Sequence, residues 1–189
     1  MNTLYMSLTE TPICNFGEKA KNFTLLSTQN IKVSLKDIIG KNGTIVMFIS
    51  NHCPYVKAVI KDIVKDTNHL KTLGVNSVAI MSNDVENYPE DSYENMITFA
   101  NEHKFEFPYL YDESQDVAKD YGAVCTPDFF CYNNNLELQY RGRIRGHKNL
   151  LPITSGDSDL LKAMKLISKT RKGPKNQIPS MGCNIKWFK

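Results

Sequence analysis

The sequence predicts an α/β domain in which a central mixed β-sheet carries helices on both faces. Two stretches carry this prediction. Residues 44–81 have the pattern of a strand, an amphipathic helix and a second strand, and such a unit is parallel because the helix crosses over between the strands. Residues 124–140 contain two apolar stretches around Asn133-Asn134-Asn135, a run that tolerates left-handed backbone and predicts an antiparallel hairpin. A sheet with both features is mixed, and the helices between its strands cover both faces.

The chain before residue 44 predicts an arm, a hairpin and a helical turn. Residues 1–20 have no clear period and are expected to form an irregular N-terminal arm. The apolar stretches 22–26 and 31–33 flank a polar run and predict an N-terminal hairpin extension. Residues 34–40 then predict a helical turn that ends at its glycine.

The central strand–helix–strand unit has the clearest pattern. Residues 44–49 are T-I-V-M-F-I, a continuous apolar run rich in β-branched residues, as expected of a buried strand. From Pro54 to Leu70 the apolar residues recur at helical spacing, and Pro54 lies in the first turn, where its missing N–H costs no hydrogen bond. Gly74 ends this helix, and residues 75–81 are the second predicted strand.

The remaining elements are shorter. A helix is expected to begin after Asp91 or Ser92 and to continue to Lys104. Next come a strand at 108–111, a helix at 113–121 closed by Gly122, the 124–140 hairpin and a last helix from Asp157 or Ser158 to Ser168. Residues 172–189 contain prolines and predict an extended C-terminal tail. Since no repeat or linker interrupts the chain, residues 1–189 are expected to form a single domain that includes the arm 1–20 and the tail.

The composition is that of an ordinary soluble protein, with 41% hydrophobic and 23% charged residues. A net charge of +3 does not favour nucleic acid or a membrane surface as a partner, and no apolar run approaches the length of a membrane span. The stretch 1–14 lacks the basic and apolar regions of a secretory signal, so we expect the protein to be cytoplasmic.

The cysteines are too few and too sparse for a disulfide framework. There are five, an odd number, at positions 14, 53, 125, 131 and 183. No two of them have C-x-x-C spacing, and the histidines have no metal-like spacing with them, so no metal and no cofactor is expected.

Cys53 is the first candidate for chemistry. It follows the strand at 44–49 and precedes Pro54, so the free N–H groups and the positive dipole end of the helix would face its sulfur. Both features favour the thiolate over the thiol. The carboxyl end of a parallel strand is also where open α/β sheets place their chemistry. We therefore interpret Cys53 as a reactive thiol; a small, buried, inert cysteine is the alternative.

Pro127 is the second notable position, because it lies at the start of an apolar strand and cannot donate a hydrogen bond to a neighbouring strand. A trans proline that begins a strand and a cis Thr126-Pro127 bond both fit this pattern.

Six stretches resemble the thioredoxin-like superfamily, and most closely the redoxins of the alkyl hydroperoxide reductase/thiol-specific antioxidant (AhpC/TSA) family. They are N-H-C-P-Y-V-K-A at 51–58, S-N-D-V-E-N-Y-P-E-D-S-Y at 82–93, F-P-Y-L-Y-D-E at 107–113, Y-G-A-V-C-T-P-D-F-F at 121–130, Y-R-G-R-I at 140–144 and P-S-M-G-C-N-I-K-W at 179–187. The resemblance implies a thioredoxin-like fold. The first and fourth stretches are specific as a pair.

The resemblance also implies roles for individual positions. Similar proteins usually carry C-N-H-C-P-Y, and Cys53 matches the second cysteine of that dithiol while Ser50 stands where the first would be. Thr126-Pro127 matches the cis-proline pair that faces the dithiol. The substrate groove would be formed by Asn51, His52, Pro54, Thr126 and Pro127. In such folds the backbone beside the cis proline can pair with an extended peptide.

Ser50 leaves two routes open, because a hydroxyl cannot take part in dithiol exchange. In one, Cys53 works alone or with a distant resolving thiol, as in peroxiredoxins. The stretch S-N-H-C-P resembles the peroxiredoxin motif T-x-x-C-P. The Ser50 hydroxyl would then bond to sulfur or to peroxide oxygen, and Cys53 would pass through sulfenic acid. In the other, the chain is a dithiol oxidoreductase without its first cysteine, which binds extended peptides without turnover.

The other candidates are a second thiol and a cation. Cys125, two residues before Pro127, is our first choice of resolving thiol, and Cys183 is a further possibility; inert packing is the alternative for each. A protonated His52 would help to hold the thiolate. A peroxidatic arginine would come from positions 141, 143 or 145, which are otherwise expected to be solvated charges on a hairpin.

These expectations combine into a function. We expect a thiol-dependent oxidoreductase of the thioredoxin or peroxiredoxin-like type, active in antioxidant or redox homeostasis. Its substrates would be protein disulfides or peroxides, and its electrons would come from a thiol reductant such as thioredoxin or glutathione. A redox-impaired module that binds extended peptides is the alternative.

Overall fold

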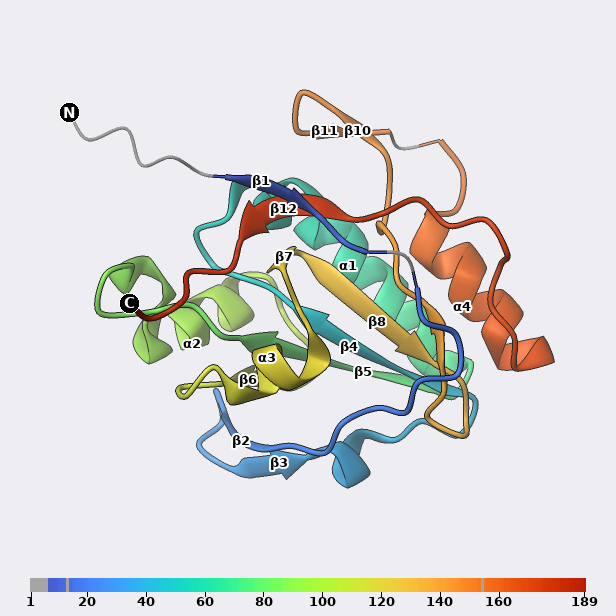
Figure 1. Cartoon of the computed structure of the whole chain (residues 1–189), viewed down its shortest axis with the longest axis horizontal. Helices are drawn as coiled ribbons and strands as arrows, with labels where there is room; N and C mark the ends of the chain where they lie inside the picture. The colour runs from blue at the N-terminus through green and yellow to red at the C-terminus, as the bar shows by residue number, and fades with distance from the viewer. Residues whose placement is uncertain (1–6, 13, 154) are drawn as a thin grey trace.

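A computed structural model describes residues 7–12, 14–153 and 155–189 of the chain (Figure 1). Its main sheet has seven strands in the order β3-β2-β6-β5-β4-β8-β9. The strands are β2 (Thr24–Ser27), β3 (Lys32–Ser34), β4 (Gly43–Phe48), β5 (Val75–Met81), β6 (Tyr109–Tyr111), β8 (Asp128–Tyr132) and β9 (Leu138–Tyr140). The β4–β5 and β5–β6 pairs are parallel and the other pairs are antiparallel, so the sheet is mixed, as the sequence predicts.

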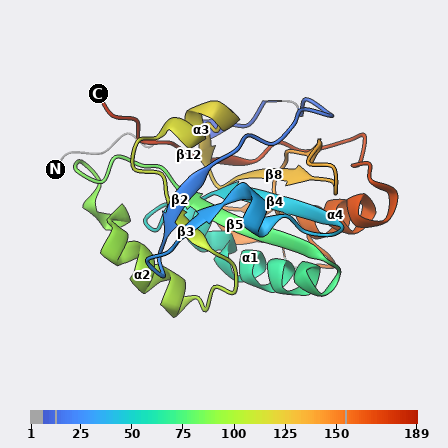
Figure 2. The same cartoon turned by 90° about the horizontal axis from the view of Figure 1, so that it is seen from below.

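Helices cover both faces of this sheet. They are α1 (Pro54–Thr72), α2 (Tyr93–Glu102), α3 (Asp116–Tyr121) and α4 (Asp159–Thr170), with 3₁₀ turns at Leu35–Ile38 and Pro89–Asp91. Figure 2 shows α1 and α2 on one side of the sheet and α3 on the other. Strand β4 is buried throughout because its alternate side chains enter different layers: Ile45 and Met47 pack in the cluster that includes α1 and α4, while Val46 and Phe48 pack in the cluster that includes α3.

A second, smaller sheet joins the two ends of the chain to the loop before β8. Strand β12 (Met181–Asn184) lies between β1 (Leu8–Glu10) and β7 (Cys125–Thr126), and it is antiparallel to both. The predicted tail is therefore extended, but it is also a paired strand, and part of the predicted irregular arm is a strand as well. Residues 1–6 and 13 of that arm lie outside the described residues. A short hairpin, β10 (His147–Lys148) and β11 (Leu151–Pro152), completes the fold.

The predicted helix starts are resolved by their capping side chains. Ser92 rather than Asp91 caps α2, and its Oγ accepts a hydrogen bond from the backbone N–H of Asn95. Ser158 caps α4 in the same way, accepting from Leu161. Gly122 adopts the left-handed conformation that closes α3.

The turn between β8 and β9 differs from the expectation. Leu136, not one of the three asparagines, takes the left-handed backbone conformation, with φ of 57°. Asn133 contributes through its side chain instead, because its Oδ1 accepts hydrogen bonds from the backbone N–H groups of Asn135 and Glu137.

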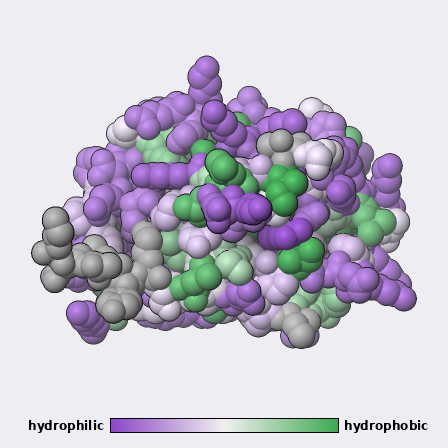
Figure 3. Space-filling view, turned by 90° about the horizontal axis from the view of Figure 1, so that it is seen from above, coloured by the Kyte–Doolittle hydropathy of each residue, from purple (hydrophilic) through white to green (hydrophobic). Residues whose placement is uncertain are grey.

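Among the described residues, no helix is long and apolar enough to cross a membrane. On the face that Figure 3 shows, hydrophobic residues occur as separate patches among hydrophilic ones.

Candidate active site

Cys53 lies at the junction of β4 and α1. It is the N-cap residue of α1, with Pro54 in the first turn, and its side chain is fully buried. The parallel strand ends just before it because Ser50 and Asn51 leave the sheet toward the loop that carries Asp91. The sulfur therefore lies at the positive end of a helix of 19 residues, as the sequence predicts.

The Thr126-Pro127 bond is cis, and its carbonyl side faces Cys53. The carbonyl oxygen of Thr126 lies 3.1 Å from Cys53 Sγ and accepts the S–H hydrogen bond of the thiol form. Of the two isomers that fit the sequence, the structure therefore has the cis form, and it places Thr126 beside the Cys53 sulfur.

Cys183 is the other neighbour of that sulfur. Strand β12 places its Sγ 3.1 Å from Cys53 Sγ. Burial of Cys53 opposes ionisation, but hydrogen bonds from the Cys183 side chain and from the backbone N–H groups of Val56 and Cys183 outweigh it. Together they lower the pKa of Cys53 below its ordinary value of 9.0. The hydrogen bond to Cys53, with burial, raises the pKa of Cys183. The pair therefore holds a thiolate at Cys53 and a proton on Cys183.

Asp91 organises the loop before Cys53. Its fully buried carboxylate accepts hydrogen bonds from the Ser50 hydroxyl at 3.0 Å, the backbone N–H of Asn51 at 2.7 Å, the ring of His52 at 2.8 Å and the side-chain amide of Asn83 at 2.7 Å. Burial raises the pKa of Asp91, yet these partners, His52 first, leave it below the ordinary value.

Sequence reasoning considered Asp91 only as a helix cap and missed this role. No local pattern predicts this contact, because Asp91 is some forty residues from the loop that it binds and only the fold brings the two together.

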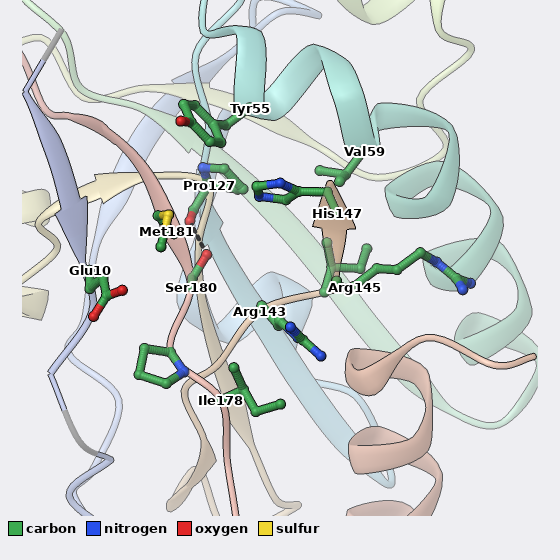
Figure 4. Close-up of a pocket in the computed structure, with 13 residues that line it drawn as sticks. Glu10, Tyr55, Val59, Pro127, Arg143, Arg145, His147, Ile178, Ser180 and Met181 are labelled. Atoms are coloured by element: carbon green, nitrogen blue, oxygen red, sulfur yellow. Dashed lines mark hydrogen bonds between the residues drawn. The ribbon is translucent and has the colours of Figure 1, made fainter. Parts of the chain in front are cut away.

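A pocket of about 240 Å³ adjoins the site on the side of the cis proline. Pro127, Tyr55 and Met181 line it next to the active-site loops, and Arg143, Arg145 and His147 line it farther along. Figure 4 shows Tyr55 and Pro127 toward one end and Ile178 toward the other, with the hydrogen bond from Ser180 Oγ to the Pro127 carbonyl, 2.6 Å long, beside the proline.

No cluster of three or more histidine, cysteine, aspartate or glutamate side chains suited to a metal ion occurs in the part of the chain that the structure describes.

Residues 16–147 match the model of the AhpC/TSA family, which is most of the chain. The chain belongs to the AhpC/TSA family. No curated protein matches the sequence. Membership of the AhpC/TSA family supports a redox function in general terms, in agreement with the thiolate at Cys53.

Two solved structures resemble the chain over nearly its full length. An uncharacterized conserved protein from Geobacillus kaustophilus is 41% identical over 98% of both chains, with a TM-score of 0.93. A hypothetical protein from Sinorhizobium meliloti 1021 is 34% identical over 95% of this chain and 98% of the other, with a TM-score of 0.88. A putative thiol:disulfide interchange protein from Chlorobium tepidum is 18% identical over 82% of this chain and 99% of the other, with a TM-score of 0.60. The last of these shows the thioredoxin-like fold alone.

The structure gives Ser50 a different role from the one that a peroxidatic AhpC/TSA site would need. Its hydroxyl has one proton, which it donates to Asp91, and its oxygen accepts the backbone N–H of Cys53 at 3.2 Å. The Ser50 hydroxyl is therefore directed at Asp91 and not at the Cys53 sulfur. Ser50 instead fixes the backbone at the start of α1.

His52 also bonds to Asp91 rather than to the sulfur. Burial opposes the charged form, but the Asp91 carboxylate raises the pKa of His52 above its ordinary 6.5. Two other predicted groove residues have structural contacts. The side-chain oxygen of Asn51 accepts a hydrogen bond from the buried Tyr109 hydroxyl at 2.8 Å, and Pro54 begins α1.

Cys125 is near the site but is not the thiol in contact with Cys53. Its Sγ is directed to the carbonyl oxygen of Pro127, 3.6 Å away, and burial raises the pKa of Cys125 strongly. Cys183, the other candidate, occupies the position at 3.1 Å. Of the two candidates, Cys183 is therefore the one in contact with Cys53.

The three arginines are engaged elsewhere. Arg141 forms a buried two-pronged ion pair with Asp128, at 3.2 and 2.8 Å, and its guanidinium lies over the ring of Phe130. Arg143 pairs with Asp159 and Arg145 with Asp62. The expectation of solvated charge is wrong for Arg141 and Arg145, which are 8% and 6% exposed, because each has a carboxylate partner within the fold.

Proposed function

We propose that this protein is a thiol–disulfide oxidoreductase that acts through the Cys53 thiolate. The observation that carries the proposal is the position of that sulfur: it belongs to the N-cap residue of α1, lies 3.1 Å from the carbonyl oxygen that precedes the cis proline and has a second thiol 3.1 Å away. A thiolate attacks a disulfide sulfur, and a second thiol then resolves the mixed disulfide that results. Cys53 and its surroundings supply the first of these groups in an ionised form at neutral pH.

Disulfides fit this site better than peroxides do. A peroxidatic site of the kind that the sequence suggests needs a hydroxyl and a guanidinium directed at the thiolate. Here the Ser50 proton goes to Asp91, and the predicted arginines are paired with Asp128, Asp159 and Asp62. The groups that do face Cys53 are the Cys183 thiol and the Thr126 carbonyl oxygen, and a neighbouring thiol suits thiol–disulfide exchange.

The partners follow from this chemistry. The oxidised protein would be returned to the dithiol form by a thiol reductant such as thioredoxin or glutathione, in a cytoplasmic compartment where such thiols stay reduced. Five cysteines without the spacing of a disulfide framework accord with such a compartment.

The peptide-binding alternative needs an open sheet edge beside Thr126. In this structure that edge is occupied, because Cys183 and Asn184 of β12 pair with Thr126 and Cys125. A peptide would therefore have to displace a strand of the protein itself, which disfavours simple binding without turnover.

The test is the reaction of the protein with glutathione disulfide, followed by the mass of each cysteine-containing peptide. We expect the reaction to be lost in Cys53→Ser and kept in Cys131→Ser, a control that removes a buried cysteine from the middle of β8. Reaction of hydrogen peroxide with Cys53 at a rate far above that of a free thiol, with no reaction toward disulfides, would contradict the assignment to disulfides.

A further inference from the structure

The contact between Cys53 and Cys183, which strand β12 creates, assigns a second thiol to the proposed activity. Strand β12 is antiparallel to β7, with Cys183 opposite Thr126, the residue before the cis proline. This is the edge at which an extended substrate would pair in a thioredoxin-like fold. The C-terminal tail thus presents a cysteine to Cys53 from the position that a substrate strand would take.

We propose that Cys183 is the resolving thiol of Cys53, and that β12 carries it as an internal substitute for a substrate strand. The proposal rests on the function proposed above and names its second thiol. In this proposal Cys183 takes the part of the first cysteine of the dithiol, whose position Ser50 occupies here. The partner sulfur then comes from the tail rather than from the start of α1.

The chemical steps balance with one disulfide substrate. The Cys53 thiolate attacks one substrate sulfur, the substrate S–S bond breaks, and the other half leaves as a thiolate that takes up a proton. Cys183 then loses its proton and attacks Cys53 Sγ, which forms the Cys53–Cys183 disulfide and releases the second half as a thiol. Two electrons pass from the two cysteines to the substrate, and a dithiol reductant restores them by the reverse exchange.

The electrostatics of the pair favour this order. Contact with Cys53 is the first cause of the raised pKa of Cys183, so Cys183 remains a thiol while its neighbour is charged. When Cys53 enters a mixed disulfide its charge is gone, and Cys183 ionises more readily. The resolving thiol therefore becomes active only after the first step.

Access to the pair depends on β12. Cys53 is 0% and Cys183 2% exposed, so a disulfide reaches Cys53 only when the strand moves. The strand is four residues long and is held at both ends: Ser180 bonds to the Pro127 carbonyl, and the backbone N–H of Lys186 donates to Asn83 at 2.9 Å. A short strand between two anchors can leave the edge and return to it.

Gly182 provides a way to displace β12 without changing a sulfur. A Cβ at this position would lie 2.0 Å from the Thr126 carbonyl oxygen, so Gly182→Ala cannot keep the strand at its observed distance. Gly17→Ala is a matched control, because a Cβ there meets no atom within 4 Å and Gly17, whose φ is 89°, bonds to Leu138 of β9 rather than to β12.

The first test treats the reduced proteins with glutathione disulfide and identifies the products by mass after a non-reducing digest. We expect wild type and Cys125→Ser to form the Cys53–Cys183 disulfide, and Cys183→Ser to stop at the mixed disulfide of Cys53 with glutathione. An intramolecular disulfide formed by Cys183→Ser at the wild-type rate, or its loss in Cys125→Ser, would overturn the assignment while leaving the proposed function intact. If Cys53 takes up no glutathione in any of the folded proteins, the proposed function falls and this proposal with it.

The second test measures alkylation of Cys53 in the folded proteins at a pH where it is ionised. We expect Gly182→Ala to react about tenfold faster or more, since overpacking of this kind shifts the population away from the closed strand, and to form the Cys53–Cys183 disulfide more slowly. Equal rates in wild type, Gly17→Ala and Gly182→Ala would overturn the role given to β12.

Discussion

Removing the Cys183 thiol should raise the pKa of Cys53. In the structure the Cys183 side chain is the first of the hydrogen-bond donors that favour the Cys53 thiolate, at an Sγ–Sγ distance of 3.1 Å. A hydrogen bond to a charged group contributes about 1.5–3 kcal/mol, and one pKa unit corresponds to about 1.36 kcal/mol. Because S–H is a weak donor, we expect Cys183→Ala to raise the pKa by about one unit, at the lower end of that range.

The measurement is the ultraviolet absorbance of the thiolate as a function of pH, since it needs no reagent to enter the buried site. Subtraction of the same titration on Cys53→Ser isolates Cys53. We expect Cys183→Ser to stay close to wild type because its hydroxyl is still a donor. Cys125→Ala is the matched control, since Cys125 is equally buried but bonds to the Pro127 carbonyl.

The reasoning would be refuted by two results. One is a Cys183→Ala protein whose Cys53 titrates at the wild-type midpoint, which would show that the helix terminus alone sets the pKa. The other is an equal shift in Cys125→Ala, which would show that the change follows from a general loosening of the small sheet rather than from the lost donor.

Three further predictions concern the surroundings of the site. Arg141→Met should lower the free energy of unfolding by about 3–5 kcal/mol in chemical denaturation, because it leaves the buried Asp128 carboxylate unpaired; Arg141→Met combined with Asp128→Leu should recover much of this loss. His52 has a raised pKa in the folded state, so its contribution to stability is present below pH 6.5 and lost as the pH rises through the folded pKa. The free energy of unfolding, measured as a function of pH, should therefore fall less steeply over this range in His52→Gln than in wild type. An equally steep fall in His52→Gln would rule out a stabilising ion pair with Asp91. Ser50→Cys should create a C-x-x-C dithiol that competes with Cys183 for the reactive sulfur, visible as a mixture of two disulfides in non-reducing digests; exclusive pairing with Cys183 would show that the first position no longer faces that sulfur.

The order of elements followed from local patterns in the sequence. The run at 44–49 is apolar on both faces, and in the structure alternate residues of β4 do enter different layers. The helix from Pro54 was predicted from its period and its proline, and α1 begins at that residue. Side-chain capping by Ser92 and Ser158 is also a local property, which is why both helix starts were among the predicted choices.

The site was predicted in part for the same reason. The position of Cys53 at a helix N-terminus depends on neighbours in sequence, whereas the second thiol and the carboxylate of the site depend on contacts across 130 and about 40 residues. The pattern of the tail gave no sign that residues 181–184 pair with the loop before β8. Asp91 was considered as a cap because an aspartate before a helix usually is one.

The sequence by itself determined the order of strands and helices and the place of Cys53 at a helix start, because strand and helix periods and glycine and proline positions are local; its motifs added the resemblance to the AhpC/TSA family. Only the tertiary structure decided which groups face that sulfur. The Ser50 hydroxyl donates to Asp91 rather than to the sulfur. Cys183 rather than Cys125 contacts Cys53, because a strand from the far end of the chain pairs beside the cis proline. Such a contact depends on how the sheets are assembled, and no run of neighbouring residues encodes it.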